Sequence, residues 1–178
     1  MPHLAVAAVG ADRPGIVAAV TGVLVEHGCN LEDTSMTILR GQFAMMLVVD
    51  VPPEVSAPDL EAALARPAAD LNLVVTVRPL EEAAVSSFPG EPWTVSVYGA
   101  DRPGIVHGVA SLLADEGVNI VDLTTRVIGD PDAPVYAMLL EVTVPLDVDP
   151  STLGARLEAL AAGLGVDCSL HSSDADIL

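Results

Sequence analysis

The sequence contains no lysine, and its few basic residues are all arginine. Seven arginines stand against 25 aspartates and glutamates, so the 178-residue chain has a formal net charge of −18. A free-standing nucleic-acid-binding protein needs a basic surface to neutralise phosphates, and a polybasic membrane anchor needs clustered cations. The composition therefore argues against both. An acidic surface is suited to solubility, or to docking on a basic partner protein.

Aromatic residues and long hydrophobic runs are also scarce. Aromatics make up 3% of a chain that is 51% hydrophobic, which is too apolar for disorder and predicts a well-packed core of small side chains. The longest stretches without Asp, Glu or Arg, at 14–25 and 103–114, have 12 residues each, short of the roughly 18 to 20 that span a bilayer. The first residues lack the basic start of a secretory signal. We therefore expect a cytoplasmic globular protein.

Cysteine and histidine are too few for the usual catalytic or metal motifs. Cys29 and Cys168 form no metal-ligand spacing and no disulfide framework, and the four histidines fit no metal motif. Glu32 and Asp33 are adjacent on an expected strand, so their carboxylates should point to opposite faces. Walker and dinucleotide-binding glycine patterns are absent. We expect no catalytic residues, no metal and no cofactor. An enzyme would require a site formed between subunits.

The chain consists largely of one unit written twice. Residues 10–17 recur unchanged at 99–106, 89 positions later. The register continues through Asn30 and Asn119, and after a small insertion at 130–134 it resumes with an offset of 93. This duplication predicts two domains of the same fold.

The composition also suggests where the domains begin and end. Between the repeats, glutamate, serine, proline and glycine are typical of a linker. We therefore expect a first domain at 1–80, a linker at 81–91, a second domain at 92–172 and an acidic tail at 173–178.

Each unit is predicted to fold as strand, helix, strand, strand, helix and strand. That order gives an antiparallel sheet with both helices on one face, the ferredoxin-like βαββαβ arrangement of the α+β class. The expected strands are 4–9, 31–39, 43–51 and 73–77, then 94–98, 120–128, 135–144 and 166–170. Exposed sheet edges favour pairing of the two units into an eight-stranded sheet, and of chains into a homodimer.

Proline and glycine predict the helix ends. The first helix is expected to begin near Pro14, or Pro103 in the second unit, because proline suits a first helical turn. Gly28 and Gly117 should end these helices. Pro67 should end or kink the second helix of the first unit near residue 69. Its counterpart carries a leucine stripe at Leu153, Leu157, Leu160 and Leu164.

The loop from the first strand into the first helix carries the strongest chemical signal. Gly10 and Gly15 would let backbone approach a bound group. The helix N-terminus beyond Pro14 offers unpaired N–H groups and partial positive charge to a carboxylate. Asp12 could receive an ammonium group, and Asn30 from a neighbouring unit could hydrogen-bond either end of the ligand. An α-amino acid carries both charges within a few bonds, so the constellation suits one.

The same residues also admit structural roles. Asp12 and Asp101 could be helix N-caps, and the asparagine after each first helix could adopt a turn conformation that most residues resist. Arg13 and Arg102 could be solvated, or paired with Asp12 or Asp33. The repeat shows that the loop is a shared element, and it leaves open whether both copies bind anything.

At these residues the chain resembles the ACT domain family. Asp-Arg-Pro-Gly-Ile-Val after the first strand, with Gly-Cys-Asn-Leu at 28–31 and Gly-Val-Asn-Ile at 117–120, is similar to that family's signature, and the resemblance covers both units. A tandem pair of such domains is similar to the glycine cleavage system transcriptional repressor family. The resemblance implies regulatory binding of a small amino acid, such as glycine or serine, between paired domains.

The resemblance also implies which residues contact the ligand. The implied positions are Gly10, Asp12, Arg13, Pro14, Gly15, Ile16, Asn30, Leu31, Gly99, Asp101, Arg102, Pro103, Gly104, Ile105, Asn119 and Ile120. Some amino-acid-binding members have histidine in place of Gly10 and Gly99, and asparagine in place of Asp12 and Asp101. An aspartate there would repel a carboxylate unless the ligand's ammonium group faces it.

We therefore expect a non-enzymatic regulatory protein whose amino-acid ligand alters its interaction with a regulatory protein partner, in transcriptional control of glycine metabolism. Two alternatives stay open. The chain could be a module that dimerises and binds a partner constitutively, or a detached regulatory subunit of a metabolic enzyme.

Overall fold

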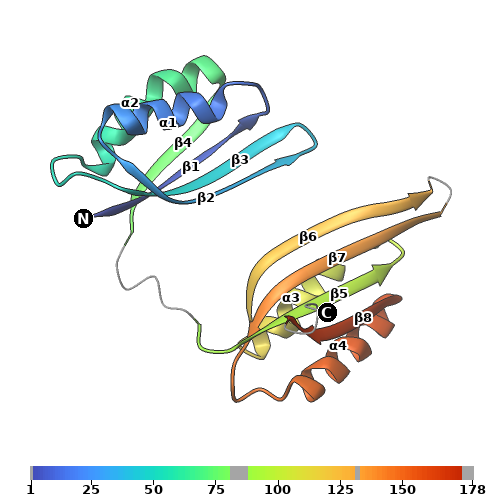
Figure 1. Ribbon diagram of the computed structural model, residues 1–178. Helices are drawn as coiled ribbons and strands as arrows, with labels where there is room; N and C mark the ends of the chain where they lie inside the picture. The colour runs from blue at the N-terminus through green and yellow to red at the C-terminus, as the bar shows by residue number, and fades with distance from the viewer. Residues whose placement is uncertain (1, 81–87, 131–132, 174–178) are drawn as a thin grey trace. The chain divides into compact units, whose positions relative to one another are not determined.

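The described residues, 2–80, 88–130 and 133–173 of the computed structural model, form the same order of six elements twice (Figure 1). The chain divides into two compact units at 1–86 and 87–178. Most of the predicted linker at 81–91 and almost all of the predicted tail at 173–178 lie outside the described residues, so those boundaries stay predictions.

The elements confirm the predicted ferredoxin-like, α+β fold in both units. The first unit contains β1 (His3–Ala11), α1 (Ile16–Glu26), β2 (Asn30–Leu39), β3 (Gln42–Asp50), α2 (Ala57–Leu71) and β4 (Leu73–Pro79). The second contains β5 (Glu91–Gly99), α3 (Ile105–Asp115), β6 (Asn119–Asp130), β7 (Ala133–Val144), α4 (Pro150–Leu164) and β8 (Val166–Ser172).

Each unit has its own four-stranded antiparallel sheet. The strand orders are β2-β3-β1-β4 and β6-β7-β5-β8, and both helices of a unit cover one face of its sheet (Figure 1). Pairing of the two sheets into one of eight strands stays a prediction. Among the described residues, no helix combines the length and the hydropathy needed to cross a bilayer.

Alternating side chains build the core between each sheet and its helices. In β1, Leu4, Val6 and Ala8 are buried, with the intervening residues more exposed, as a half-covered strand requires. The leucine stripe of α4 is only partly confirmed. Leu153 and Leu157 are buried, but Ala161 continues the buried row, while Leu160 and Leu164 pack at the margin of the core.

Two helix boundaries lie two residues beyond their predicted positions. α1 begins at Ile16, two residues after Pro14, because Gly15 adopts the left-handed conformation at φ 97° and only the following residue is helical. Pro67 does not end α2, which continues to Leu71. Burial of Leu64 and Ala68 on either side of Pro67 holds that turn against the sheet. Asn72, at φ 54°, ends the helix instead.

Gly28 and Gly117 end the first helices as predicted. Gly28 has φ 68°, and its N–H donates to the Val25 carbonyl at 3.0 Å. The next N–H, of Cys29, donates to the Leu24 carbonyl at 2.9 Å. These two hydrogen bonds form the Schellman motif, which glycine adopts without steric cost.

The second helix of each unit has a side-chain cap at its N-terminus. Ser56 accepts a hydrogen bond from the N–H of Asp59, whose carboxylate accepts one from the Ser56 N–H. Asp149 likewise accepts from the N–H of Thr152 at 2.9 Å. The Thr152 hydroxyl and N–H bonds hold the pKa of the Asp149 carboxyl below its usual value of 3.8.

The Asp149 cap makes the stability of the second unit dependent on pH. Because the folded-state pKa is lowered, the stabilisation is fully present above the ordinary pKa and is lost as pH falls through the folded-state pKa. We predict that Asp149→Ala lowers the melting temperature at pH 7, and that the difference from wild type shrinks at the acid end of a pH series. Asp147→Ala, at an exposed position two residues earlier, is the control. A difference that persists unchanged into acid would contradict the cap assignment.

Candidate functional site

The first helix of each unit begins without a side-chain cap. Gly15 and Gly104 are the N-cap residues, both at φ 97°, and no side chain bonds to the first turn. The first intrahelical bond joins the Ala19 N–H to the Gly15 carbonyl at 2.9 Å. The N–H groups of residues 16–18 therefore have no intrahelical acceptor.

The structure overturns two of the structural alternatives considered for the loop residues. Asp12 and Asp101 are not N-caps, because each lies three residues before the glycine that holds the cap position. Asn30 and Asn119 do not occupy a left-handed turn. They are the first residues of β2 and β6, and the glycines before them take the left-handed conformation.

The open end of α1 lies in a groove. Residues 12–18, with Met36 of β2 and Phe43 of β3, line a space of about 500 Å³. The groove stays open because every residue of β2 is exposed. One wall therefore presents helix N–H groups and Asp12, while the exposed side chains of Val17 and Met36 form an apolar wall.

The second unit differs at the base of the same loop. Tyr136 takes the place of Phe43 and is 8% exposed. Burial, and then the nearby charge of Asp101, raise the pKa of Tyr136, while a hydrogen bond with Thr125 opposes the rise. This loop therefore has a phenol hydroxyl near its aspartate, which the first unit lacks.

Several of the predicted contact residues have packing roles. A Cβ on Gly10 would lie 2.8 Å from the backbone oxygen of Asn72, and one on Gly99 would lie 3.0 Å from Cα of Val166. These glycines let the loop before the last strand, or that strand itself, approach closely. The side chains of Ile16 and Ile105 are core residues, so only their backbones are available to a ligand.

Arg13 and Arg102 do not form the ion pairs considered for them. Among the described residues, neither arginine pairs with Asp12 or Asp33. The Arg102 guanidinium lies against Gly165, at the C-terminus of α4, where the helix dipole favours a cation. Pro14 and Pro103 are exposed in the loops, and Leu31 and Ile120 follow the asparagines on the edge strands.

One unit does not bring the loop and the asparagine together. The end of β1 pairs with Gln42 at one end of β3, whereas Asn30 pairs with Asp50 at the other end. Gln42 and Asp50 are eight residue steps apart along the strand, or roughly 26 Å. A ligand touching both the loop and an asparagine therefore needs a second unit.

The structure also brings together a cluster that the sequence did not predict. Nε2 of His3 lies 3.1 Å from Oε2 of Glu32 and 3.1 Å from Oδ1 of Asp50. The prediction that Glu32 and Asp33 point to opposite faces is wrong, because a β-bulge at Glu32 interrupts the alternation. No local sequence signal gives this bulge or the meeting of three strands.

The cysteines are poor nucleophiles. Both are free thiols, and burial raises the pKa of each, that of Cys168 to about 11. A thiol with a raised pKa is protonated at neutral pH and reacts slowly.

Substitution at Gly10 tests its packing role. We predict that Gly10→Ala lowers the stability by about 1 to 3 kcal/mol, because the new methyl group must displace backbone. Gly22→Ala in α1 is the matched control, since nothing lies within 4 Å of its Cβ position, and alanine there should be neutral or stabilising. Equal unfolding midpoints for both variants in a denaturant titration would contradict the packing role.

Comparison with known proteins shows the same duplication. A family model described as ACT domain matches residues 3–78, and a second model of that description matches 93–162. The glycine cleavage system transcriptional repressor of Escherichia coli is 25% identical over 171 residues, covering 95% of this chain and 89% of that protein. A UPF0237 protein of Methanopyrus kandleri is 43% identical over 79 residues, 44% of this chain and 88% of that protein.

Among solved structures, the crystal structure of an unknown protein from Galdieria sulphuraria matches with a TM-score of 0.82 and 26% identity. The match covers 96% of this chain and 98% of that chain. The similarity therefore extends over nearly the whole of both proteins.

Proposed function

The chain belongs to the ACT domain family, and we propose that it is a non-enzymatic, cytoplasmic sensor of a small α-amino acid. The ligand is of the size of glycine or serine. Its carboxylate binds the open N-terminus of α1 or α3, and occupancy changes the interaction of the chain with a regulatory protein partner.

The observation that supports this proposal most strongly is the contrast between the helices within each unit. α2 and α4 have side-chain caps, whereas α1 and α3 leave their first N–H groups unpaired behind a left-handed glycine. A ligand carboxylate at such an end gains roughly 0.3 to 1 kcal/mol from the helix dipole, and more when partly buried. The carboxylate also accepts hydrogen bonds from the N–H groups that no side chain caps.

Asp12 and Asp101 supply the complementary charge. Each lies three residues before its helix cap and is exposed. An α-amino acid whose carboxylate meets the helix would present its ammonium group to this aspartate. Both halves of a zwitterion are then matched, and the groove of about 500 Å³ has room for a small amino acid.

The asparagines contribute from a second unit. β2 and β6 are edge strands, and their exposed faces carry apolar side chains such as Met36 and Val127. If two such edges pair in antiparallel fashion, the start of one strand lies beside the end of the other. Asn30 of one unit then approaches the loop at 12–15 of another, and this pairing makes a homodimer or a paired tandem.

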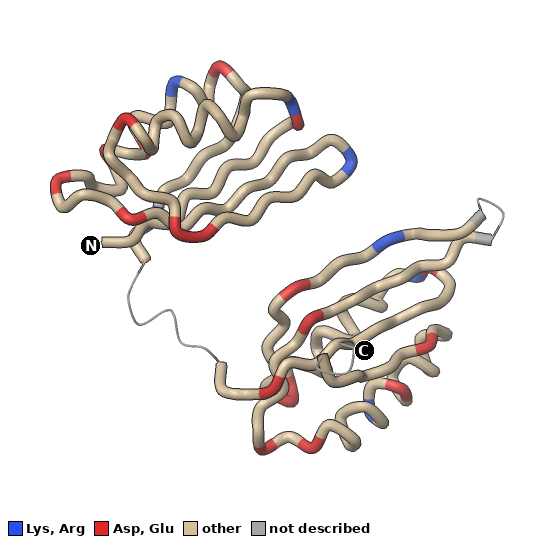
Figure 2. The backbone as a smooth tube through the Cα atoms, viewed as in Figure 1, with Lys and Arg blue, Asp and Glu red and all other residues tan. Residues whose placement is uncertain are grey.

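The regulatory role is supported by the relative whose similarity spans 95% of this chain, a glycine cleavage system transcriptional repressor. Acidic residues outnumber basic ones in both units (Figure 2), so direct docking on DNA is disfavoured. We therefore propose that any effect on transcription, in the control of glycine metabolism, runs through a protein partner.

A second candidate is a constitutive interaction module, either free or as a detached subunit of a metabolic enzyme. The exposed apolar side chains of β2, Leu31, Met36 and Ile38, favour it, because they would serve dimerisation equally well without a ligand. The two candidates differ in whether partner binding responds to an amino acid.

A proline substitution tests the helix-end site directly. Val17 is the second residue of α1, and the chain already has a proline, Pro58, at the second residue of α2. Val17→Pro removes one open N–H without breaking a helical bond. In a thermal-shift screen of the twenty amino acids, we predict that this variant binds the hit roughly tenfold or more weakly, since a hydrogen bond to a charged group contributes about 1.5 kcal/mol or more.

Val17→Ala is the matched control, because it removes the side chain and keeps the N–H. The pair Val106→Pro and Val106→Ala repeats the test in the second unit. Equal affinity in the proline and alanine variants would contradict the helix-end site. A screen without any hit on folded protein would favour the constitutive module.

A second prediction follows if the ligand site is shared between two units. Asn30→Ala should weaken amino-acid binding, although Asn30 lies roughly 26 Å from the loop of its own unit. Ser35→Ala, elsewhere on the same exposed strand, is the control. Calorimetric titration measures both, and unchanged affinity in Asn30→Ala would show that the ligand needs only one unit.

A further inference from the structure

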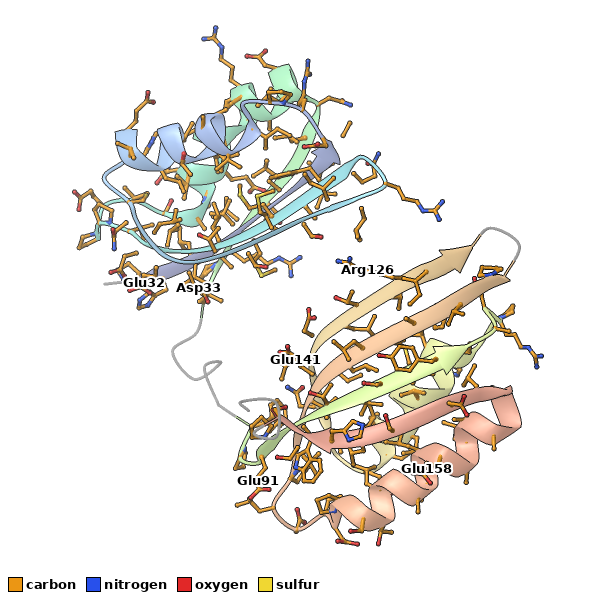
Figure 3. The ribbon with its side chains drawn as sticks, turned by 45° about the vertical axis from the view of Figure 1, so that its right-hand side comes forward. Glu32, Asp33, Glu91, Arg126, Glu141 and Glu158 are labelled. Carbon is orange, nitrogen blue, oxygen red and sulfur yellow. The ribbon has the colours of Figure 1, made fainter. Side chains whose placement is uncertain are left out.

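Three metal-binding side chains meet at one end of the first sheet. His3 is the first residue of β1 and pairs across the sheet with Asp50, the last residue of β3. Glu32 comes from β2, on the other side of β3. Figure 3 labels Glu32 at this end of the unit. The three donor atoms all lie within 4.8 Å of one another.

The bulge of β2 brings Glu32 into this cluster. Leu31 pairs with Val49 and Asp33 pairs with Val48, so Glu32 is an extra residue without a partner of its own. Bulges re-aim side chains out of the regular alternation. As a result Glu32 reaches to 3.1 Å from His3, which lies two strands away.

One carboxylate oxygen of Asp50 in this cluster has no hydrogen bond within the described part of the chain. Its Oδ1 is buried, and within the described residues it has no hydrogen-bond partner. Nε2 of His3 lies 3.1 Å from this oxygen, yet the contact lacks the geometry of a hydrogen bond. A buried carboxylate oxygen without a hydrogen bond is costly, and a metal cation in contact with both atoms would satisfy it.

The spacing of the donors fits a metal ion. Two donors each about 2.1 Å from an ion lie about 3.0 Å apart when they are at right angles around it, and about 3.4 Å apart in the tetrahedral geometry of zinc. The His3–Glu32 and His3–Asp50 separations are both 3.1 Å. One imidazole nitrogen and two carboxylate oxygens suit a first-row divalent transition ion better than Mg²⁺ or Ca²⁺, which prefer oxygen alone.

The second unit shows that the fold does not require these residues. Pro92, Val121 and Thr143 stand at the corresponding positions. Its strand β6 has the same irregularity, between Ile120 and Asp122. The bulge is therefore shared by both units, whereas the second unit has neither a histidine nor a carboxylate at these three positions.

We infer that His3, Glu32 and Asp50 bind one divalent transition-metal ion. Zn²⁺ is the ion used to test this site. Three protein ligands leave at least one coordination position for water or for another molecule. The inference does not depend on amino-acid binding.

The test measures metal binding by the full-length chain after treatment with a chelator and without any amino acid. Zn²⁺ is titrated in competition with a chromophoric chelator. We expect one strong site per chain, a rise in melting temperature with Zn²⁺, and affinity at least roughly tenfold weaker in Glu32→Gln and in His3→Gln, because even loss of an outer-shell partner costs 10-fold or more. Glu61→Gln on α2 and His171→Gln on β8 remove the same groups elsewhere and should bind like wild type.

Co²⁺ absorption gives a second measurement that does not depend on any variant folding. Nitrogen and oxygen ligands should give weak visible bands without the intense near-ultraviolet band of a thiolate. Equal Zn²⁺ affinity in wild type and Glu32→Gln would overturn the inference, and so would a thiolate band. Val17→Pro should bind Zn²⁺ like wild type. Loss of metal binding can therefore be distinguished from loss of amino-acid binding.

Discussion

A left-handed glycine before the first helix is the constraint on which the rest of each unit depends. At φ 97°, Gly15 and Gly104 turn the chain from the first strand into the helix within a few residues, a conformation that is strained for any side chain with a Cβ. No polar side chain occupies the cap position, so the first N–H groups of the helix stay open. The same turn leaves the preceding aspartate exposed beside them. In the proposed site, recognition of a carboxylate and of an ammonium group would thus depend on one backbone conformation.

The uncovered edge strand is the second feature that shapes the proposed function. Both helices pack over the other strands, and β2 is exposed along its whole length. The groove at the helix end is open for this reason, and the asparagine at the start of β2 is too far away to reach it within one unit. A ligand site shared between units would couple occupancy to pairing. Such coupling would let a ligand regulate the proposed sensor, because a ligand can shift an equilibrium only through its differential affinity for two states.

The sequence predicted the features that repeat and that local rules govern. The order of the elements and the helix endings at Gly28 and Gly117 follow from hydrophobic periodicity and from left-handed glycines. The helix start was misplaced because proline rules favoured Pro14, whereas Gly15 decides the cap. The cluster of His3 with Glu32 and Asp50 could not be predicted, since it depends on a bulge and on the register of three strands. For the candidate site, the loop could be read from the sequence, but the packing roles of Gly10 and Arg102 could not.

The most direct test of the open helix end is a ¹⁵N–¹H correlation spectrum of the full-length chain titrated with glycine. We expect concentration-dependent shifts of the amides of residues 16–18 and 105–107, which have no intrahelical acceptor. The amides of Ala57 and Asp59, at the capped start of α2, serve as the internal reference and should stay in place. Movement of the capped amides alone, or no movement with any of the twenty amino acids, would contradict the claim that these helix ends bind a carboxylate.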